Sequence, residues 1–156
     1  MKQKYIDLYM KMAQSISELS SAVRLKVGTV IVKDNVVTYG YNGTPSGWDN
    51  NCEYKVYANE WSIDNDIWQY KDDNDRPYNL KTKPETLHSE ANALMKIAKS
   101  TISSEGATLF CTHAPCIDCA KMIYQAGIFT VWYRDEYRSQ DGIEFLKQSG
   151  VDVKKY

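Results

Sequence analysis

Helical and strand-like segments alternate along the second half of the chain, and this alternation restricts the fold more than any other feature. Helical patterns cover residues 90–99, 117–126 and 142–148, and strand-like apolar runs cover residues 107–112, 129–133 and 151–153. Strands that alternate with helices pair in parallel, and the connecting helices pack on the sheet. The second half therefore predicts an α/β domain with helices on both faces of its sheet.

The first half adds a helix and a hairpin. Apolar residues recur at helical spacing over residues 5–19, which predicts an amphipathic helix. Two β-branched runs, 27–32 and 36–41, flank an Asp-Asn turn pair and predict a hairpin whose strands are both buried on two faces. The complete order, α-β-β-α-β-α-β-α-β, predicts a three-layer α/β/α sandwich around a five-stranded mixed sheet.

Composition excludes several classes of protein. The chain has 156 residues, which fits a single domain over residues 1–156, and its net charge is −1. Proteins that bind nucleic acid or anionic membranes through charge need an excess of Lys and Arg, so neither partner is expected. Four cysteines are too few for a disulfide scaffold, and we find no secretory or membrane-spanning apolar run. We expect a cytoplasmic protein.

Residues at about 42–86 differ in character from the rest of the chain. They are rich in Gly, Pro, Asn and Asp, which predicts a long irregular insertion in the domain. Trp48, Trp61 and Trp68 lie in this segment and suggest that it packs somewhere, for example on a neighbouring subunit.

Two short motifs carry the chemistry, His88-Ser89-Glu90 and Pro115-Cys116-Ile117-Asp118-Cys119. The combination of H-x-E with P-C-x-x-C is the signature of the zinc deaminases. If Pro115 is the first residue of its helix, Cys116 and Cys119 share one face of the first turn, where the helix N-terminus favours thiolates. His88 begins the other helix. Three ligands with an open fourth position are typical of a catalytic zinc site.

Three further residues could complete the zinc coordination. Cys111 lies in a predicted strand and should alternate away from the motifs, which favours core packing. His113 stands two residues before Pro115, where a contact with substrate and a role at the strand end fit equally well. Cys52 is compatible with burial or with a second metal, but too few His and Cys residues remain for a second zinc site.

The motifs predict hydrolytic deamination. Zinc in such a site lowers the pKa of a water molecule toward about 7. Glu90 is not a ligand, and we expect it to take the water proton and pass it to ring nitrogen N3. After attack at C4, Glu90 protonates the departing amine.

Four runs of the chain resemble the deoxycytidylate (dCMP) deaminases, which have the cytidine-deaminase-like fold. These runs are Arg24–Gly28, Gly40–Gly47, His88–Ala93 and Pro115–Lys121. The glycine-rich run 40–47 is the specific part of this resemblance. The resemblance implies conversion of dCMP to dUMP and ammonia, which supplies thymidylate and dTTP synthesis. It also implies homo-hexamers, activation by dCTP, inhibition by dTTP, and Mg²⁺ with the bound triphosphate.

The resemblance also implies roles for individual residues. His88, Cys116 and Cys119 would bind one catalytic Zn²⁺, and Glu90 would move the proton. The nucleotide would be bound by the backbone around Ala91 and Thr112, by Asn42 at the deoxyribose, by Tyr137, and by Arg24 at the 5′-phosphate. The effector triphosphate would bind the turn of Tyr41, Asn42 and Gly43, whose backbone could form an anion nest. A plain turn after a strand would also produce the Gly and Pro content of this run, but the deaminase motifs favour the nucleotide interpretation.

The chain departs from the family pattern at several positions, including His113, which stands where a small polar residue is commoner. Ser89 replaces the usual Ala between His and Glu, a small change that we expect to face away from zinc. Ala22 and Thr86 stand where some viral members carry ligands of a second, structural zinc, so only Cys52 remains and that site is expected to be lost.

Two other functions remain open at this point. A nucleic-acid deaminase acting on tRNA or single-stranded DNA would need a basic, aromatic-lined track, which the charge of −1 disfavours. A non-catalytic domain stabilised by zinc would leave the carboxylate of Glu90 without a purpose.

Overall fold

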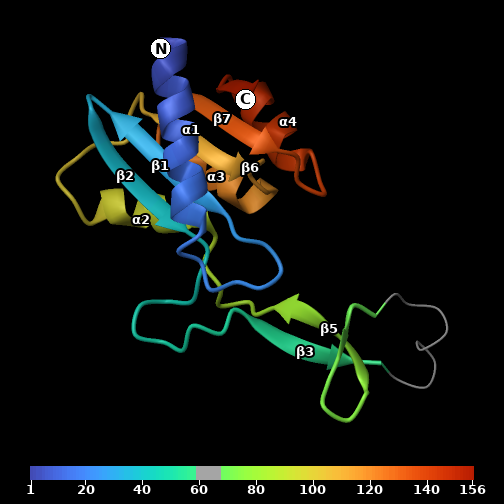
Figure 1. The fold of residues 1–156 in the computed structure, drawn as a ribbon. Helices are drawn as coiled ribbons and strands as arrows, with labels where there is room; N and C mark the ends of the chain where they lie inside the picture. The colour runs from blue at the N-terminus through green and yellow to red at the C-terminus, as the bar shows by residue number, and fades with distance from the viewer. Residues whose placement is uncertain (59–67) are drawn as a thin grey trace.

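The computed structural model describes residues 1–58 and 68–156, and its centre is a five-stranded sheet with the order β2-β1-β6-β7-β8 (Figure 1). The bounds of the strands are β1 Gly28–Lys33, β2 Val36–Tyr41, β6 Thr108–His113, β7 Thr130–Asp135 and β8 Asp152–Lys155. β1 pairs antiparallel with β2 and β6, whereas β6, β7 and β8 pair in parallel. The predicted mixed sheet is confirmed, including its parallel half.

Helices cover both faces of this sheet. In the described part of the chain they are α1 Gln3–Ser17, α2 Ser89–Ala98, α3 Ile117–Gln125 and α4 Asp141–Gln148. α1 crosses one face, where Met10 packs in a cluster with Val30 and Phe110 (Figure 1). α2, α3 and α4 cover the other face around Ile31 and Leu109. The predicted three-layer α/β/α sandwich is confirmed. Within the described residues, no helix combines the length and the apolar content needed to cross a bilayer.

The hairpin strands differ in burial, which corrects one prediction. β1 is buried over nearly its whole length, as expected, because it lies between β2 and β6. β2 lies at the edge of the sheet and exposes Val36 and Tyr39, at 44% and 43%. The continuous apolar run of residues 36–41 therefore does not correspond to burial on both faces.

A second sheet replaces the predicted irregular insertion. β3 Glu53–Tyr57, β5 Pro77–Thr82 and β4 Tyr70–Lys71 pair antiparallel in the order β3-β5-β4. We call these three strands the arm, which projects away from the main sheet (Figure 1). The Tyr78 ring centroid lies 5.7 Å from that of Tyr57 and 5.4 Å from that of Tyr70. Cross-strand aromatic pairs of this kind stabilise strands despite the surrounding Asn, Asp and Pro residues.

The tryptophans of this segment differ in exposure. Trp48 is exposed and Trp68 is half-buried. Trp61 lies outside the described residues. Packing of this segment on a neighbouring subunit stays a prediction.

Glu53 ties the arm to the body of the protein. This buried acid is 5% exposed and begins β3. Its Oε1 atom accepts hydrogen bonds from the backbone N–H groups of Val23 and Arg24, at 3.1 and 3.2 Å. The Arg24 guanidinium donates a hydrogen bond to Thr82 Oγ1 in β5, at 3.1 Å. The arm therefore holds the loop between α1 and β1.

Two glycines allow close packing at the starts of α2 and α3. A Cβ atom on Gly40 in β2 would overlap the Ser89 carbonyl oxygen and lie 2.5 Å from the Ala93 nitrogen. A Cβ atom on Gly142 in α4 would overlap the Pro115 carbonyl oxygen. Because backbone atoms cannot move aside as side-chain ends do, these contacts determine where both helices begin.

We expect Gly40→Ala to lower the free energy of unfolding by about 1–3 kcal/mol, because the added methyl group forces α2 away from β2. Urea denaturation measures this change. Gly43→Ala is the matched control, since its Cβ would lie 3.8 Å from the nearest atom, in the Tyr41 ring, and we expect a change below about 1 kcal/mol. Equal losses in the two variants would contradict the close-packing argument.

Candidate metal centre

The structure brings the two sequence motifs together at two helix starts. His88 is the N-cap residue of α2 and Cys116 is the N-cap residue of α3, and both have extended backbones. Cys119 lies in the first turn of α3. Pro115 was predicted as the first helical residue, but α3 begins at Ile117. The N-cap position explains the difference. Because Cys116 has an extended backbone, the regular helix begins only after it, and Pro115 lies before the cap.

The donor atoms of His88, Cys116 and Cys119 form a compact cluster, which we call the donor cluster. All three atoms lie within 4.8 Å of one another. The His88 Nδ1 atom is 3.5 Å from Cys116 Sγ and 3.4 Å from Cys119 Sγ. Tetrahedral zinc with Zn–N of about 2.0–2.1 Å and Zn–S of about 2.3 Å would place nitrogen and sulfur about 3.6 Å apart. The donor cluster therefore fits one zinc ion with little movement.

The three donor residues shift one another's pKa values. A hydrogen bond from the Cys119 thiol lowers the pKa of Cys116 to about 4. The same hydrogen bond, together with burial, raises the pKa of Cys119, which keeps its proton. The hydrogen bond to Cys116 also raises the pKa of His88. Metal binding to these residues must therefore release protons, as is usual for thiolate and imidazole ligands.

The other candidate ligands lie elsewhere. Cys111 is fully buried in the core beside Ile31 and Leu109, which confirms core packing, and burial raises the pKa of its thiol to about 12. His113 Nε2 lies 3.8 Å from an oxygen of Asp135. Cys52 is buried with its sulfur 3.5 Å from Ser21 Oγ. Within residues 1–58 and 68–156, the donor cluster contains three residues that could bind a metal.

Glu90 lies beside the donor cluster as a buried acid. It is the second residue of α2 and is 4% exposed. Burial raises the pKa of its carboxyl group, so this group can hold a proton closer to neutral pH than an exposed glutamate can. The Ser89 hydroxyl donates a hydrogen bond to Glu90 Oε2 at 2.9 Å. Ser89 therefore contacts the carboxylate, a contact that the sequence did not predict.

The predicted nucleotide-binding residues surround the same end of the sheet. Thr112 ends the buried part of β6, and its Oγ1 accepts a hydrogen bond from the Gly28 N–H group at 3.1 Å. Ala91 is half-buried in the first turn of α2. Tyr137 packs on a small cluster with Ala114, two residues before Cys116. Arg24 is exposed on the loop that Glu53 holds.

Asn42 and its turn have well-defined structural partners. Asn42 Oδ1 accepts a hydrogen bond from the Val27 N–H group at 2.7 Å, and Nδ2 donates one to the Leu25 carbonyl at 2.8 Å. The backbone N–H groups of Asn42 and Gly43 donate to the carbonyls of Val27 and Leu87. The Tyr41 carbonyl accepts a hydrogen bond from Asn92 Nδ2 at 3.0 Å. In this conformation, the N–H groups of Asn42 and Gly43 are not free to form an anion nest.

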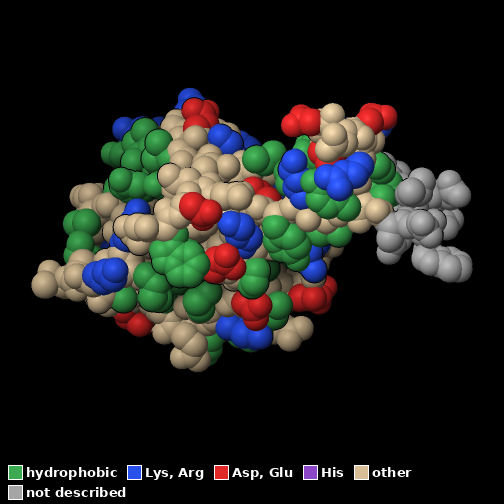
Figure 2. All heavy atoms as spheres, turned by 90° about the horizontal axis from the view of Figure 1, so that it is seen from below, with side chains coloured by type: hydrophobic (Ala, Val, Ile, Leu, Met, Phe, Trp, Pro, Cys, Tyr) green, Lys and Arg blue, Asp and Glu red, His purple; other side chains and the backbone are tan. Residues whose placement is uncertain are grey.

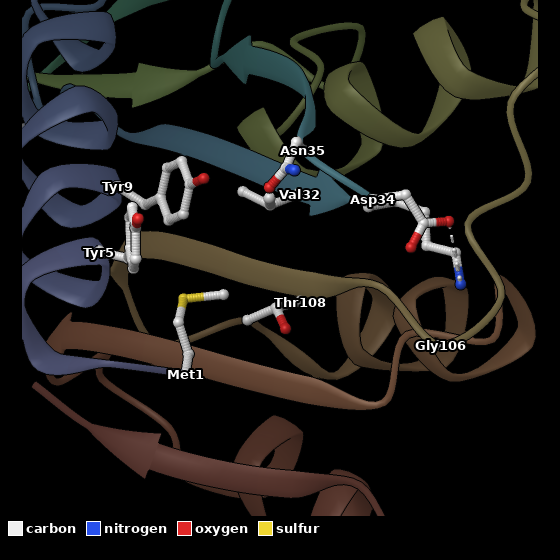
Figure 3. Close-up of a pocket in the computed structure, with 9 residues that line it drawn as sticks. Met1, Tyr5, Tyr9, Val32, Asp34, Asn35, Gly106 and Thr108 are labelled. Carbon is white, nitrogen blue, oxygen red and sulfur yellow. Dashed lines mark ion pairs between the residues drawn. The ribbon is translucent and has the colours of Figure 1, made fainter.

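A surface hollow of about 350 Å³ lies at the opposite end of the sheet (Figure 3). Tyr5 and Tyr9 of α1 point toward it, across from Thr108 and the β1–β2 turn at Asp34 and Asn35. Residues of the two motifs do not line this hollow, so it is separate from the metal centre.

The comparison with protein families agrees with the geometry. Residues 3–134 match the model of the cytidine and deoxycytidylate deaminase zinc-binding region. The chain belongs to this family. Membership confirms the resemblance drawn from the motifs, and it identifies zinc as the metal that the family binds.

Individual relatives extend the match to the whole chain. A dCMP deaminase from the cyanophage S-TIM5, crystallised with dCMP and dUMP, is 43% identical, with a TM-score of 0.82 over 100% of this chain and 99% of that one. ComE operon protein 2 of Bacillus subtilis is 33% identical over 92% of this chain and 68% of its own length. Deoxycytidylate deaminase of Saccharomyces cerevisiae is 31% identical over 100% of this chain, which spans only 46% of the yeast protein.

We expect purified protein to contain one zinc per chain, and Cys119→Ser to lose most of it because a serine hydroxyl does not replace a thiolate ligand. Elemental analysis of freshly purified material measures the zinc content. Cys52→Ser is the matched control: this cysteine is also buried but lies outside the donor cluster. Full zinc in Cys119→Ser would contradict the assignment.

Proposed function

We propose that this protein is a zinc-dependent deaminase that hydrolyses dCMP to dUMP and ammonia. The observation that carries the proposal is the full-length likeness to the cyanophage S-TIM5 dCMP deaminase crystallised with dCMP and dUMP, at 43% identity. The donor cluster and the buried carboxylate of Glu90 support the same chemistry. His88, Cys116 and Cys119 would hold the zinc ion, which when bound supplies a Lewis acid that acidifies water.

Glu90 carries out the proton transfers of the reaction. Glu90 accepts a proton from the attacking water and delivers it to ring nitrogen N3 as the water oxygen bonds to C4. Glu90 then carries the second proton to the amino group, which leaves as ammonia while the C4 oxygen becomes the carbonyl of dUMP. The raised pKa of this buried carboxyl suits both steps, because a group that takes and returns protons works best near the operating pH.

We assign the nucleotide contacts to residues around the metal centre. The backbone near Ala91 and Thr112 faces the base, Asn42 binds the deoxyribose, and Tyr137 lies near the substrate. The Arg24 guanidinium binds the 5′-phosphate, and its support comes from the exposed position of this cation on a loop that Glu53 holds in place.

We also propose regulation and assembly like those of the dCMP deaminases. The single domain would act in pyrimidine deoxynucleotide synthesis in the cytoplasm, as a homo-hexamer activated by dCTP and inhibited by dTTP with Mg²⁺. The effector would bind the turn of Tyr41, Asn42 and Gly43. Because the N–H groups of Asn42 and Gly43 already have carbonyl partners, this turn would have to rearrange on binding.

The charge distribution disfavours a nucleic-acid substrate. Single-stranded nucleic acid is bound along a positively charged groove with aromatic side chains. Figure 2 shows Lys, Arg, Asp and Glu side chains intermixed over one face of the described residues, including the arm. The net charge of −1 agrees with this view. A non-catalytic zinc domain is also disfavoured. Burial of the Glu90 carboxyl group costs free energy because the group loses its contact with water, and such a domain would have no use for this group.

We expect dCMP to be deaminated faster than cytidine or deoxycytidine, because the Arg24 guanidinium binds the 5′-phosphate that these nucleosides lack, and dCTP is included as a further candidate substrate. Ammonia release from each compound, with and without dCTP or dTTP and Mg²⁺, measures this preference. An oligonucleotide containing cytosine, added as competitor, tests the nucleic-acid alternative. A preference for unphosphorylated nucleosides would overturn both the substrate and the Arg24 assignment.

We expect Glu90→Gln to retain zinc and to lower kcat by about 10²- to 10⁴-fold, because the amide has the shape of the acid but cannot transfer the proton. Zinc content and steady-state kinetics with dCMP measure the two effects separately. If the variant kept more than about a tenth of the wild-type rate, Glu90 would not be the proton carrier.

A further inference from the structure

A row of three buried polar side chains leads from the middle of the sheet to Glu90. Thr29 lies in β1, Ser89 is the first residue of α2, and Glu90 follows it. Thr29 and Ser89 are 0% exposed and Glu90 is 4% exposed. The Ser89 hydroxyl donates to Glu90 Oε2 at 2.9 Å, and the Thr29 and Ser89 hydroxyl oxygens are 2.7 Å apart. These contacts form a continuous hydrogen-bonded chain.

The Thr29 hydroxyl has a second neighbour besides Ser89. Each hydroxyl carries one proton, and the proton of Ser89 is engaged with Glu90. The one Thr29 proton lies within hydrogen-bond distance of both Ser89 Oγ, at 2.7 Å, and Cys111 Sγ, at 3.2 Å. Thr29 belongs to β1, which lies between β2 and β6, so these contacts connect the Glu90 carboxylate to a central strand of the sheet.

The carboxylate of Glu90 has few other restraints. Among the side chains of residues 1–58 and 68–156, Ser89 is the hydrogen-bond partner of this carboxylate. The bond engages Oε2, and the backbone N–H group of Glu90 also donates a hydrogen bond to this carboxylate. A carboxylate without such a partner can rotate about its last side-chain torsion, which has a broad, shallow profile.

We propose that Ser89 and Thr29 are positioning residues that hold the Glu90 carboxylate in the orientation required for proton transfer, an inference that rests on the proposed deaminase function. Functional groups need support from neighbouring side chains to within about 0.5 Å of their productive geometry. Ser89 stands where Ala is usual in the deaminases that the chain resembles.

The test compares isosteric variants of the two hydroxyls. In zinc-loaded protein, we expect Ser89→Ala and Thr29→Val each to lower kcat for dCMP about tenfold while KM changes less than about twofold. The double variant should lose no more than either single variant, since the two hydroxyls act as one unit. Thr29→Ser keeps the hydroxyl and should keep the wild-type kcat.

Ser17→Ala is the matched control for removal of a buried hydroxyl. Ser17 is 2% exposed, and its hydroxyl donates to the Gln14 carbonyl within α1 at 2.7 Å. This variant should keep the wild-type kcat. Zinc content and thermal unfolding of every variant separate a positioning effect from a loss of metal or of folded protein. If either Ser89→Ala or Thr29→Val does not fold, the kcat of the other single variant tests the inference.

A crystallographic measurement does not depend on turnover. In zinc-loaded Ser89→Ala crystals, we expect the Glu90 carboxylate to rotate or to occupy more than one orientation, whereas the wild type shows one. Two results would overturn the inference if the wild type is active on dCMP. One is a kcat in both single variants equal to that of the wild type. The other is a Glu90 carboxylate in the Ser89→Ala crystals with the same orientation as in the wild type. Wild type that is inactive on dCMP would instead overturn the proposed function, and the crystals would still decide the role of the hydroxyls.

Discussion

The metal centre depends on the convergence of two helix N-termini. His88 and Cys116 cap α2 and α3 with extended backbones, and Cys119 joins them from the first turn. The partial positive charge at both helix ends favours the thiolates that a metal needs. Gly40 and Gly142 let neighbouring backbones approach these helix starts closely, so the separation of the three donors is set by backbone contacts. A shift of either helix would separate the donors.

The parts of the fold that depend on local patterns could be predicted from the sequence. Cys116 and Cys119 are three residues apart in one turn, and His88 and Glu90 share one helix start, so their chemistry follows from spacing alone. The alternation of strands and helices likewise predicted the main sheet. The helical pattern from residue 117 matches the observed start of α3, whereas the placement of Pro115 as the first helical residue was wrong, because Pro115 precedes the N-cap residue Cys116.

Features that depend on distant contacts could not be predicted. Exposure of β2 follows from its place at the edge of the sheet, and the arm follows from tyrosine pairs between strands. Buried acids are the strongest case. Glu53 is stabilised by backbone N–H groups of the α1–β1 loop, and the Glu90 carboxylate accepts a hydrogen bond from the Ser89 hydroxyl. The one local sign was Thr29, a polar residue in an otherwise apolar strand.

The far edge of the main sheet carries a consequence for solubility. β8 is the last strand on that side, and its backbone is open to pairing with another chain. Lys154 and Lys155 lie in this strand, each in an ion pair, with Asp152 at 2.6 Å and Glu136 at 2.7 Å. Charged side chains on an edge strand discourage aggregation through sheet extension, because a docking strand would have to desolvate them. Extension of the sheet from β8 would therefore require these two ion pairs to lose their contact with water.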